Sequence, residues 1–318
     1  MHAESTSAAA AITLRGVSKH YGAVHAVDGV DLEVRRGEVF GLIGHNGAGK
    51  STLFKLMLGL VLPTAGQIHI AGAPVSGRGF RAVRRQLGYL PENVVLWDNL
   101  SGLETLRFFA RLKGAPMSDC AAVLDRVGLT QVAARAVREY SKGMRQRLGF
   151  AQALLGAPQV LLLDEPTAGL DPHAIRAFYD TLAALRAQGV TIVLSSHILA
   201  ELQLRVDRLV VLSNGRVQAL GSVQQLREQQ DLPLTVMLRL ASGDVAAAEQ
   251  ALATLPGVPG VGFVPQRTPE GLRLHCPRAA KVALLQALAP LGARLLDVQV
   301  IEPSLEDLFF GAPAREAH

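Results

Sequence analysis

Hydrophobic and polar positions in the first two thirds of the chain follow the pattern of an α/β protein. Nearly continuous apolar runs predict strands at 160–166 and 190–196, and a helix-like segment at about 172–188 separates them. Strands that lack alternation are typical of parallel sheets buried on both faces. The pattern therefore predicts a parallel sheet with helices on both sides.

The other elements of this part follow from the same periodicity. Asn214-Gly215 predicts the turn of a hairpin between strands at 206–212 and 215–220. Pro63 is expected to end a helix that covers 50–61. Residues 1–11 are small and polar, and we expect them to be disordered. Further strands are expected at 12–22, 39–43 and 67–71, and residues 99–156 are rich in helix formers.

The composition changes near residue 230, and a second, smaller pattern follows. Strands are expected at 234–240, 261–265, 271–276 and 293–300, with helices at 244–255 and 279–289. This βαββαβ order is typical of a ferredoxin-like α+β domain. The sequence therefore predicts a first domain over 12–230, a second over 231–312, and a tail at 313–318.

Composition and charge narrow the class of protein. Hydrophobic residues make up 49% and charged residues 19%, which is enough apolar material for a packed core. Cys120 and Cys276 lie far apart, so neither a disulfide framework nor a cysteine metal site is expected. The net charge is +5, but the main basic cluster, 78–85, holds one aromatic residue. A nucleic-acid groove would need more aromatics for base stacking, so we expect no nucleic-acid partner.

The most specific motif lies between the strand at 39–43 and the helix that follows it. It fits G-x-x-x-x-G-K-[ST], whose backbone N–H groups wrap phosphates at a helix start. Lys50 is expected to reach the β- and γ-phosphates, and Ser51 to bind Mg²⁺. The expected nucleotide-binding residues of this loop are Gly44, His45, Asn46, Gly47, Ala48, Gly49, Lys50, Ser51 and Thr52.

Polar residues follow the two buried strands where each one ends. Asp164 and Glu165 come after the first, and we expect Asp164 to hold Mg²⁺ and Glu165 to polarise the attacking water. His197 follows the second strand and is expected to contact the γ-phosphate. The carboxyl ends of parallel strands share one sheet edge, so these side chains are expected to meet there.

A further motif, YSKGM at 140–144, opens an apolar helix. Ser141 is an ordinary helix N-cap in one interpretation. In the other, Ser141 and Gly143 receive the γ-phosphate of a nucleotide held by a second copy of the chain.

Taken in order, these motifs resemble the nucleotide-binding subunits of ABC transporters over about residues 12–225. The resemblance implies a P-loop ABC-type nucleotide-binding domain with a helical subdomain. It implies that Tyr21 stacks on adenine, that Glu92 occupies the Q-loop position beside Mg²⁺, and that Asp171 belongs to the D-loop. It also implies a transport-coupled ATP hydrolase with ATP and Mg²⁺ as cofactors. Such a subunit forms a homodimer around ATP and works with a transmembrane permease at the cytoplasmic face of the inner membrane.

The chain departs from the common family pattern at three positions. Glu92 replaces a glutamine and loses its amide donors. Lys142 and Met144 replace the glycine and glutamine of the usual signature. We expect these changes to tune hydrolysis without abolishing it.

Three stretches, 88–94, 101–114 and 140–156, are similar to the branch that matures the copper centres of nitrous oxide reductase. The C-terminal motif at 303–309 is similar to an exporter-like branch. These likenesses imply copper or sulfur delivery and a periplasmic copper-handling partner. No C-x-x-C pair and no cluster of histidine or methionine is visible, so we expect copper to be bound by partners and not by this chain.

Three other functions fit parts of the sequence. The first is the ATPase of a drug, lipid or ion exporter. The second is a soluble ABC protein acting on ribosomes or DNA, which would usually carry two ATP-binding halves or a long coiled coil. The third is a small-molecule kinase, which the signature motif and His197 disfavour.

Overall fold

The computed structural model describes residues 10–77, 79–229, 233–241, 243–253, 265–302 and 309. The chain divides into two compact units, residues 1–223 and 224–318. The first strand begins at Ala10, and the side chain of Ala11 is buried in the core. The expectation of disorder is therefore wrong for residues 10 and 11, which belong to a strand, and the rest of that segment, 1–9, lies outside the described residues.

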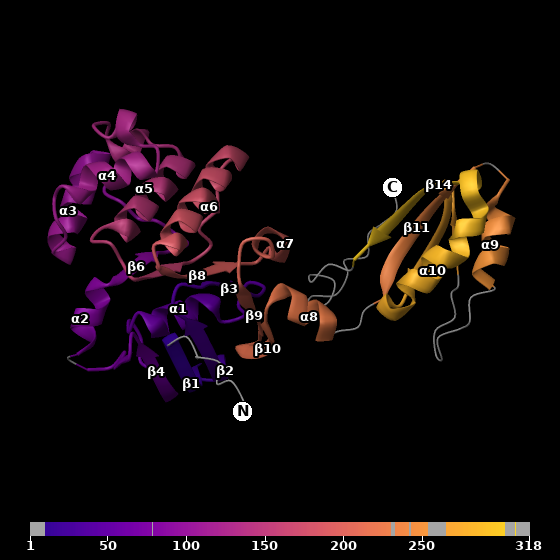
Figure 1. Ribbon diagram of the computed structural model, residues 1–318. Coiled ribbons are helices and arrows are strands. Elements are labelled where there is room, and N and C mark those ends of the chain that lie inside the picture. Colours follow the sequence, from indigo (N-terminus) through magenta and orange to yellow (C-terminus); the bar gives the residue numbers. More distant parts are fainter. Residues whose placement is uncertain are drawn as a thin grey trace, which may run out of the picture. The chain divides into compact units, whose positions relative to one another are not determined.

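The first unit is built on a six-stranded sheet (Figure 1). Neighbouring strands are parallel except for one antiparallel pair at the edge, which confirms the predicted parallel sheet and the hairpin at 206–220. The three central strands β3, β8 and β7 are buried along their whole length. In spatial order the strands are β10 (Arg216–Gly221), β9 (Arg208–Ser213), β3 (Val39–Ile43), β8 (Thr191–Ser196), β7 (Val160–Leu163) and β6 (Leu87–Leu90).

A second, antiparallel sheet shares the core of this unit. Its order is β2 (Val24–Arg35), β1 (Ala10–Tyr21), β4 (Ala65–Ile70) and β5 (Ala73–Pro74). Helix α1 (Lys50–Met57) contributes Leu53 and Phe54 to a core cluster that also holds side chains of both sheets. This shared core fixes α1, and with it the loop that precedes α1.

Helix α1 is shorter than expected. Its last helical residue is Met57, and Gly59 adopts a left-handed conformation with φ +62°. The N–H of Leu60 then bonds to the carbonyl of Lys55, which closes the helix in the usual glycine-terminated way. Gly59 therefore ends the helix before Pro63 is reached.

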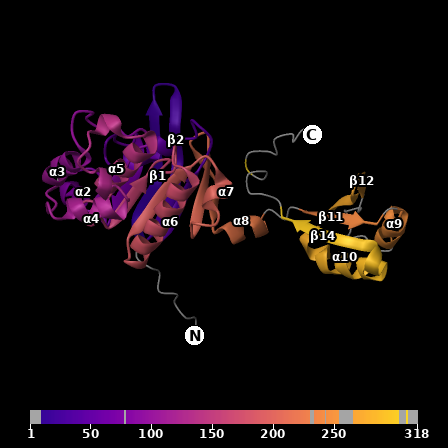
Figure 2. The same cartoon turned by 90° about the horizontal axis from the view of Figure 1, so that it is seen from above.

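The remaining helices of the first unit form a helical subdomain and cover the sheet (Figure 2). Helices α3, α4 and α5 pack against one another, α5 contacts β6, and α6 contacts β8. Among the described residues, no helix is long and apolar enough to cross a membrane. The helices are α2 (Phe80–Arg85), α3 (Gly102–Lys113), α4 (Asp119–Arg126), α5 (Lys142–Leu154), α6 (Pro172–Ala187) and α7 (Leu199–Leu202), with short 3₁₀ turns at Thr130–Val132 and Val137–Glu139. Helix α8 (Val223–Gln229) begins at the last residue of the first unit, so the boundary between the units lies at the start of this helix, whereas the predicted boundary at 230/231 would follow it.

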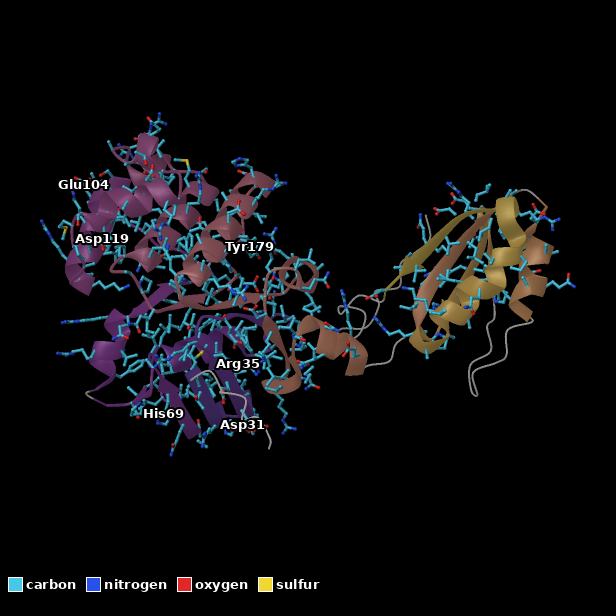
Figure 3. All side chains as sticks on the ribbon, viewed as in Figure 1. Asp31, Arg35, His69, Glu104, Asp119 and Tyr179 are labelled. Atoms are coloured by element: carbon cyan, nitrogen blue, oxygen red, sulfur yellow. The ribbon has the colours of Figure 1, made fainter. Side chains whose placement is uncertain are left out.

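The start of α3 is fixed by a reciprocal cap. The N–H of Glu104 donates to the Ser101 hydroxyl, and the Glu104 carboxylate accepts the N–H of Ser101 at 2.8 Å. Figure 3 labels Glu104 in this helix. These bonds satisfy two backbone donors that the helix leaves without partners. The N–H and the hydroxyl of Ser101 both donate to the Glu104 carboxylate, and these two bonds lower the pKa of Glu104 because they favour its charged form.

The second unit is an antiparallel sheet with two helices, in the predicted βαββαβ order. The sheet order is β12 (Gln266–Thr268), β13 (Gly271–Cys276), β11 (Leu234–Leu240) and β14 (Leu295–Ile301). Alternate side chains of β11 and β13 pack with α9 (Val245–Ala253) and α10 (Lys281–Leu288) in one core. Short 3₁₀ segments, Arg278–Ala280 and Ala289–Arg294, flank α10.

The second strand of this unit differs from the prediction. Residues 261–264 of the expected strand lie outside the described residues, and Pro265 is not part of a strand. The strand that pairs with β13 is β12, immediately after Pro265. Proline lacks the N–H that a ladder needs, which explains why pairing begins one residue later.

Close packing of α5 on β6 gives a test of the fold. A Cβ at Gly88 would lie 2.2 Å from the carbonyl oxygen of Ala153 and 2.5 Å from Leu161 Cδ2. We therefore expect Gly88→Ala to lower the free energy of unfolding by about 2 kcal/mol, because backbone must move. Denaturant titration followed by circular dichroism measures this.

Gly79→Ala is the matched control. Gly79 has φ −64°, and a Cβ there meets no atom within 4 Å. Its effect should stay within about 0.5 kcal/mol of zero. Equal effects of the two variants would contradict the packing argument.

Candidate nucleotide site

The candidate site lies where the central strands end. Strand β3 pairs in parallel with β8, and β8 pairs in parallel with β7. Their carboxyl ends therefore share one edge of the sheet (Figure 1). Lys50 follows β3 across the glycine-rich loop, Glu165 follows β7, and His197 follows β8. The structure thus brings together three residues that are far apart in the sequence.

The loop between β3 and α1 is tightly constrained. Gly49 has φ +105°, and a Cβ there would lie 2.5 Å from the carbonyl oxygen of Ala26. A Cβ at Gly44 would lie 2.7 Å from both Ala48 Cβ and the carbonyl oxygen of Leu212. Glycine is needed at both positions, because the backbone passes too close to its neighbours for a side chain. The same closeness allows backbone N–H groups to approach an anion.

Lys50 is held at the centre of the site. Its ammonium donates to the carbonyl of Gly44 at 2.5 Å and to that of His45 at 3.5 Å. It also lies 3.3 Å from Glu165 Oε1, and only 7% of the lysine side chain is exposed. This geometry places a buried positive charge at the start of α1, where the helix dipole also favours an anion.

The Glu165 carboxylate bridges two of the predicted site residues. Its Oε1 faces Lys50, and its Oε2 lies 2.9 Å from Nδ1 of His197. Glu165 itself has φ +47°, a left-handed conformation that is rare outside glycine. Backbone strain of this kind persists only where the surroundings enforce it, and it is often found at functional sites.

Ser195, the next-to-last residue of β8, positions the two acidic residues that follow β7. Its hydroxyl donates to Asp164 Oδ1 at 2.6 Å and accepts the N–H of Glu165 at 2.9 Å. Asp164 is 2% exposed, so this bond replaces water as its partner. One hydroxyl therefore fixes the direction of Asp164 and the unusual backbone of Glu165 together.

A cavity of about 820 Å³ opens over these residues. It contains most of the predicted loop together with Glu92 and Tyr21, whose side chain is 47% exposed. Two predicted residues of the loop, Gly44 and Ala48, are not among the residues that line it. The cavity is lined by Tyr21, Val24, His25, Ala26, His45, Asn46, Gly47, Gly49, Lys50, Ser51, Thr52, Glu92, Glu165, Ala168, His197 and Asn214.

Oxygen ligands suited to Mg²⁺ gather at the same edge. Ser51 and Glu92 line the cavity, and Asp164 directly follows the adjoining strand β7 but is not among the lining residues. Mg²⁺ prefers hard oxygen ligands of this kind, so the residues present fit the ion. Burial raises the pKa of Tyr89 to about 12, with smaller contributions from the charges of Asp164 and Glu92. Tyr89 therefore stays neutral beside these carboxylates.

Three other predicted residues lie outside this cavity. Ser141 caps α5 by accepting the N–H of Met144 at 3.2 Å, and Gly143 lies in the first turn of that helix. Asp171 caps α6 by accepting the N–H of Ala174 at 2.8 Å. This bond lowers the pKa of Asp171 and keeps it charged. The interpretation of Ser141 as an ordinary N-cap is confirmed. Within one chain, these three residues do not line the cavity that contains Lys50.

Some residues of the site were missed in the sequence. Ser195 appeared only as the end of a strand, and Gln146 only as part of a helix. Gln146 is buried and donates to the carbonyl of Pro166 at 3.1 Å, which ties α5 to the segment after Glu165. Asn214, in the turn between β9 and β10, and His25, near the start of β2, also line the cavity. A polar residue at the end of a wholly apolar strand, such as Ser195, was the available signal.

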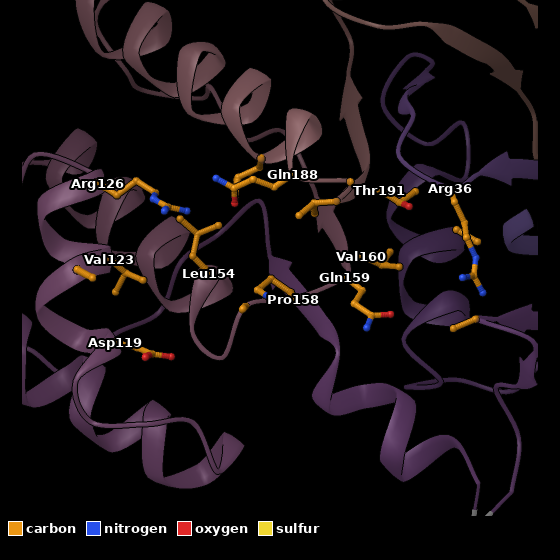
Figure 4. A pocket seen from close by; sticks show the side chains of 17 residues that line it. Arg36, Asp119, Val123, Arg126, Leu154, Pro158, Gln159, Val160, Gln188 and Thr191 are labelled. Atoms are coloured by element: carbon orange, nitrogen blue, oxygen red, sulfur yellow. The ribbon is translucent and has the colours of Figure 1, made fainter. Parts of the chain in front are cut away.

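A second cavity lies at the opposite edge of the sheet. Figure 4 shows this cavity of about 640 Å³, which includes Val160 and Thr191 at the amino ends of β7 and β8. Asp119 and Arg126 from α4 also line it. Ligands of open α/β sheets bind at the carboxyl ends of the strands, so the first cavity is the candidate site.

Comparison with known proteins identifies the family. The family model for ABC transporters matches residues 27–168. The daunorubicin resistance ATP-binding protein DrrA3 of Streptomyces coeruleorubidus is 37% identical over 304 residues, with 94% of each chain covered. The chain belongs to the ABC transporter ATP-binding proteins. It is an ATPase subunit of this family.

Other relatives agree with this assignment. A Nod factor export ATP-binding protein I from a Rhizobium species is 41% identical, covering 69% of this chain and 73% of the relative. A solved ATP-binding subunit of an ABC transporter is 36% identical with a TM-score of 0.64, covering 69% of this chain and 92% of that one. A dimeric ATP-binding cassette with ADP and Pi is 25% identical with a TM-score of 0.62, covering 67% and 98%. The predicted P-loop ABC fold is therefore confirmed.

The double role of Ser195 gives a test that is specific to this ABC ATPase. We expect Ser195→Ala to lower the ATP hydrolysis rate by about 10- to 100-fold, because Asp164 and the Glu165 backbone lose their common partner. Release of inorganic phosphate at saturating ATP measures the rate.

Thr191→Ala is the matched control for this variant. Thr191 is buried on the same strand, and its hydroxyl accepts the N–H of Gly37 at 3.0 Å at the opposite edge of the sheet. Both variants remove a buried hydroxyl, but only Ser195→Ala should slow hydrolysis. Equal rates in the two variants would contradict the positioning role of Ser195.

Proposed function

We propose that the subunit hydrolyses Mg²⁺-bound ATP with Glu165 as the general base. The observation that carries this proposal is the contact of Glu165 with both Lys50 and His197 at the end of β7. Lys50 binds the β- and γ-phosphates, and Glu165 accepts a proton from the attacking water. His197 holds Glu165 in place and donates to the γ-phosphate.

The other side chains bind the nucleotide and its ion. Tyr21 stacks on adenine at the open end of the cavity, and the loop residues from His45 to Thr52 surround the phosphates. Ser51, Asp164 and Glu92 hold Mg²⁺. The bound ion supplies charge that stabilises the phosphates during hydrolysis.

We propose that two copies of the chain enclose the nucleotides between them. Ser141 is exposed at the start of the 13-residue helix α5 and lies outside the chain's own cavity. A second copy therefore brings Ser141 and Gly143 to the γ-phosphate, and Asp171 lies at the contact. The dimeric relative solved with ADP and Pi supports this arrangement. ATP binding closes the dimer and hydrolysis opens it.

The partner of this dimer is a transmembrane permease. Several large apolar side chains are exposed around the helical subdomain, including Val95, Trp97, Phe108 and Leu112. The aromatic rings of Trp97, Phe108 and Phe109 contact one another. An exposed apolar cluster of this kind suits a protein partner. The subunit then binds peripherally at the cytoplasmic face of the inner membrane.

The relatives favour an exporter of organic molecules as the complete transporter. They include a daunorubicin resistance protein that matches along nearly the whole chain and a protein of Nod factor export. The second candidate is copper or sulfur delivery for nitrous oxide reductase, with a periplasmic copper-handling partner. It rests on the three stretches at 88–94, 101–114 and 140–156.

Glu165→Gln tests the catalytic proposal. We expect ATP to bind with similar affinity, but hydrolysis should slow by at least about 100-fold, because the amide cannot accept the proton. ATP should then hold the variant as a dimer, which size-exclusion chromatography with light scattering measures.

Glu139→Gln is the control, since Glu139 is exposed on a 3₁₀ turn away from the cavity. It should hydrolyse ATP at the wild-type rate. Wild-type turnover by Glu165→Gln, or a monomer in the presence of ATP, would contradict the proposal.

A deletion of the gene in its host separates the two cargo classes. If the transporter exports organic molecules, nitrous oxide reductase should keep its full copper content, and tolerance to the exported compound should fall. If it serves copper-centre maturation, the reductase should be synthesised but should lack part of its copper. Metal analysis of the purified reductase decides between these outcomes.

A further inference from the structure

The hairpin formed by β1 and β2 brings together three residues that can ligate a metal. Ligand atoms of His20, His25 and Asp28 all lie within 4.8 Å of one another. The expectation from the sequence that no histidines cluster is therefore wrong at this hairpin. We propose that these three side chains bind one late divalent transition-metal ion, of which Zn²⁺ is the representative.

Strand pairing explains how the histidines meet. His20 and His25 are direct partners in the antiparallel register, and the next pair, Tyr21 and Val24, closes the hairpin. Direct partners project from the same face of a sheet. The two imidazole rings are stacked, with centroids 3.9 Å apart and planes at 24°. Both ligands are therefore held side by side before any ion binds.

A β-bulge brings the third ligand to this face. His20 pairs with His25, but Lys19 pairs with Val27, so Ala26 is an extra residue on β2. In a regular strand, residues three apart project from opposite faces. The extra residue cancels this difference and places Asp28 on the face of His25. The spacing in the sequence alone did not show this.

Two potential ligand atoms of the cluster, on His20 and Asp28, make no hydrogen bond within the described residues. Nε2 of His20 is buried and has no hydrogen-bond partner among the described residues. Asp28 Oδ2 accepts two bonds from Arg216, at 2.9 and 2.7 Å, which fix the carboxylate, and Oδ1 accepts no hydrogen bond within the described part of the chain. A charged group that orients a ligating carboxylate is a common feature of protein metal sites.

The ligand set selects the class of ion. Two imidazoles and one carboxylate suit Zn²⁺, Cu²⁺ or Ni²⁺, whereas Mg²⁺ and Ca²⁺ prefer oxygen ligands. Ligand atoms around a tetrahedral Zn²⁺ lie about 3.4 Å apart, from bond lengths of about 2.1 Å. The three ligand atoms, now within 4.8 Å of one another, therefore need only small side-chain rotations to reach this separation. A water molecule would supply the fourth ligand.

The proposed ion site adjoins the nucleotide site and is separate from its phosphate-binding part. His25 lines the ATP cavity, and Tyr21 follows His20 at the end of β1. The N–H of Asp28 donates to the carbonyl of Gly215, whose own N–H donates to the carbonyl of Ala48. An ion held here would tie the hairpin that carries Tyr21 to the glycine-rich loop.

Zn²⁺ titration of the full chain without a polyhistidine tag tests this proposal. Isothermal titration calorimetry at neutral pH should show one Zn²⁺ bound per chain. His20→Ala and Asp28→Asn should each weaken this binding by at least about tenfold, because each removes one of three ligands. His69→Ala is the control, since His69 lies on β4 of the same antiparallel sheet but outside the cluster, and it should bind Zn²⁺ like the wild type.

Co²⁺ provides a second measurement, which reports the coordination of the bound ion. Bound in place of Zn²⁺, Co²⁺ should give a visible absorption band in the wild type that His20→Gln, a variant of similar size and polarity, lacks. Wild-type chain that binds no Zn²⁺, or His20 and Asp28 variants that bind it unchanged, would overturn the proposal. Loss of binding in His197→Ala with retention in His20→Ala would also overturn it, by placing the ion in the nucleotide site.

Discussion

The parallel pairing of β3, β8 and β7 is the constraint on which the functional site depends. The register places Ile43 beside Ser196, and Leu163 beside Leu194. Each strand is buried along its length, so a slip of one residue would turn every side chain to the other face. The burial of these strands fixes their register. The register in turn sets where the glycine-rich loop, Glu165 and His197 follow the strand ends.

The buried charged groups at this edge of the sheet depend on one another for compensation. Lys50 and Glu165 form an ion pair with side chains 7% and 12% exposed, and Asp164 lies beside it with a hydroxyl in place of water. Removing one partner of such a pair leaves the other charge buried without compensation. The site thus combines a strong local field with fixed directions, which is the form of electrostatic preorganisation that phosphate chemistry requires.

The antiparallel sheet contributes in a different way. Its hairpin supplies the exposed Tyr21 and packs the carbonyl of Ala26 against Gly49, so the bulged strand and the glycine-rich loop constrain each other. Bulges often redirect side chains beside functional sites. Here the same bulge that fits Ala26 against the loop also turns Asp28 toward the histidines. Nucleotide binding and the proposed ion site therefore share one local backbone feature.

The sequence by itself determined the parallel sheet, the glycine-rich loop and the order of the polar residues that follow the strands, because burial and phosphate binding each need specific residue types at fixed spacing. It also indicated a second unit with the βαββαβ order, although the division lies at 223/224 and not at the predicted 230/231. Only the tertiary structure decided that Gly59 ends α1, that Ser195 joins Asp164 to Glu165, and that His20, His25 and Asp28 meet. These features depend on strand register and on contacts between distant segments, which residue spacing along the chain does not encode.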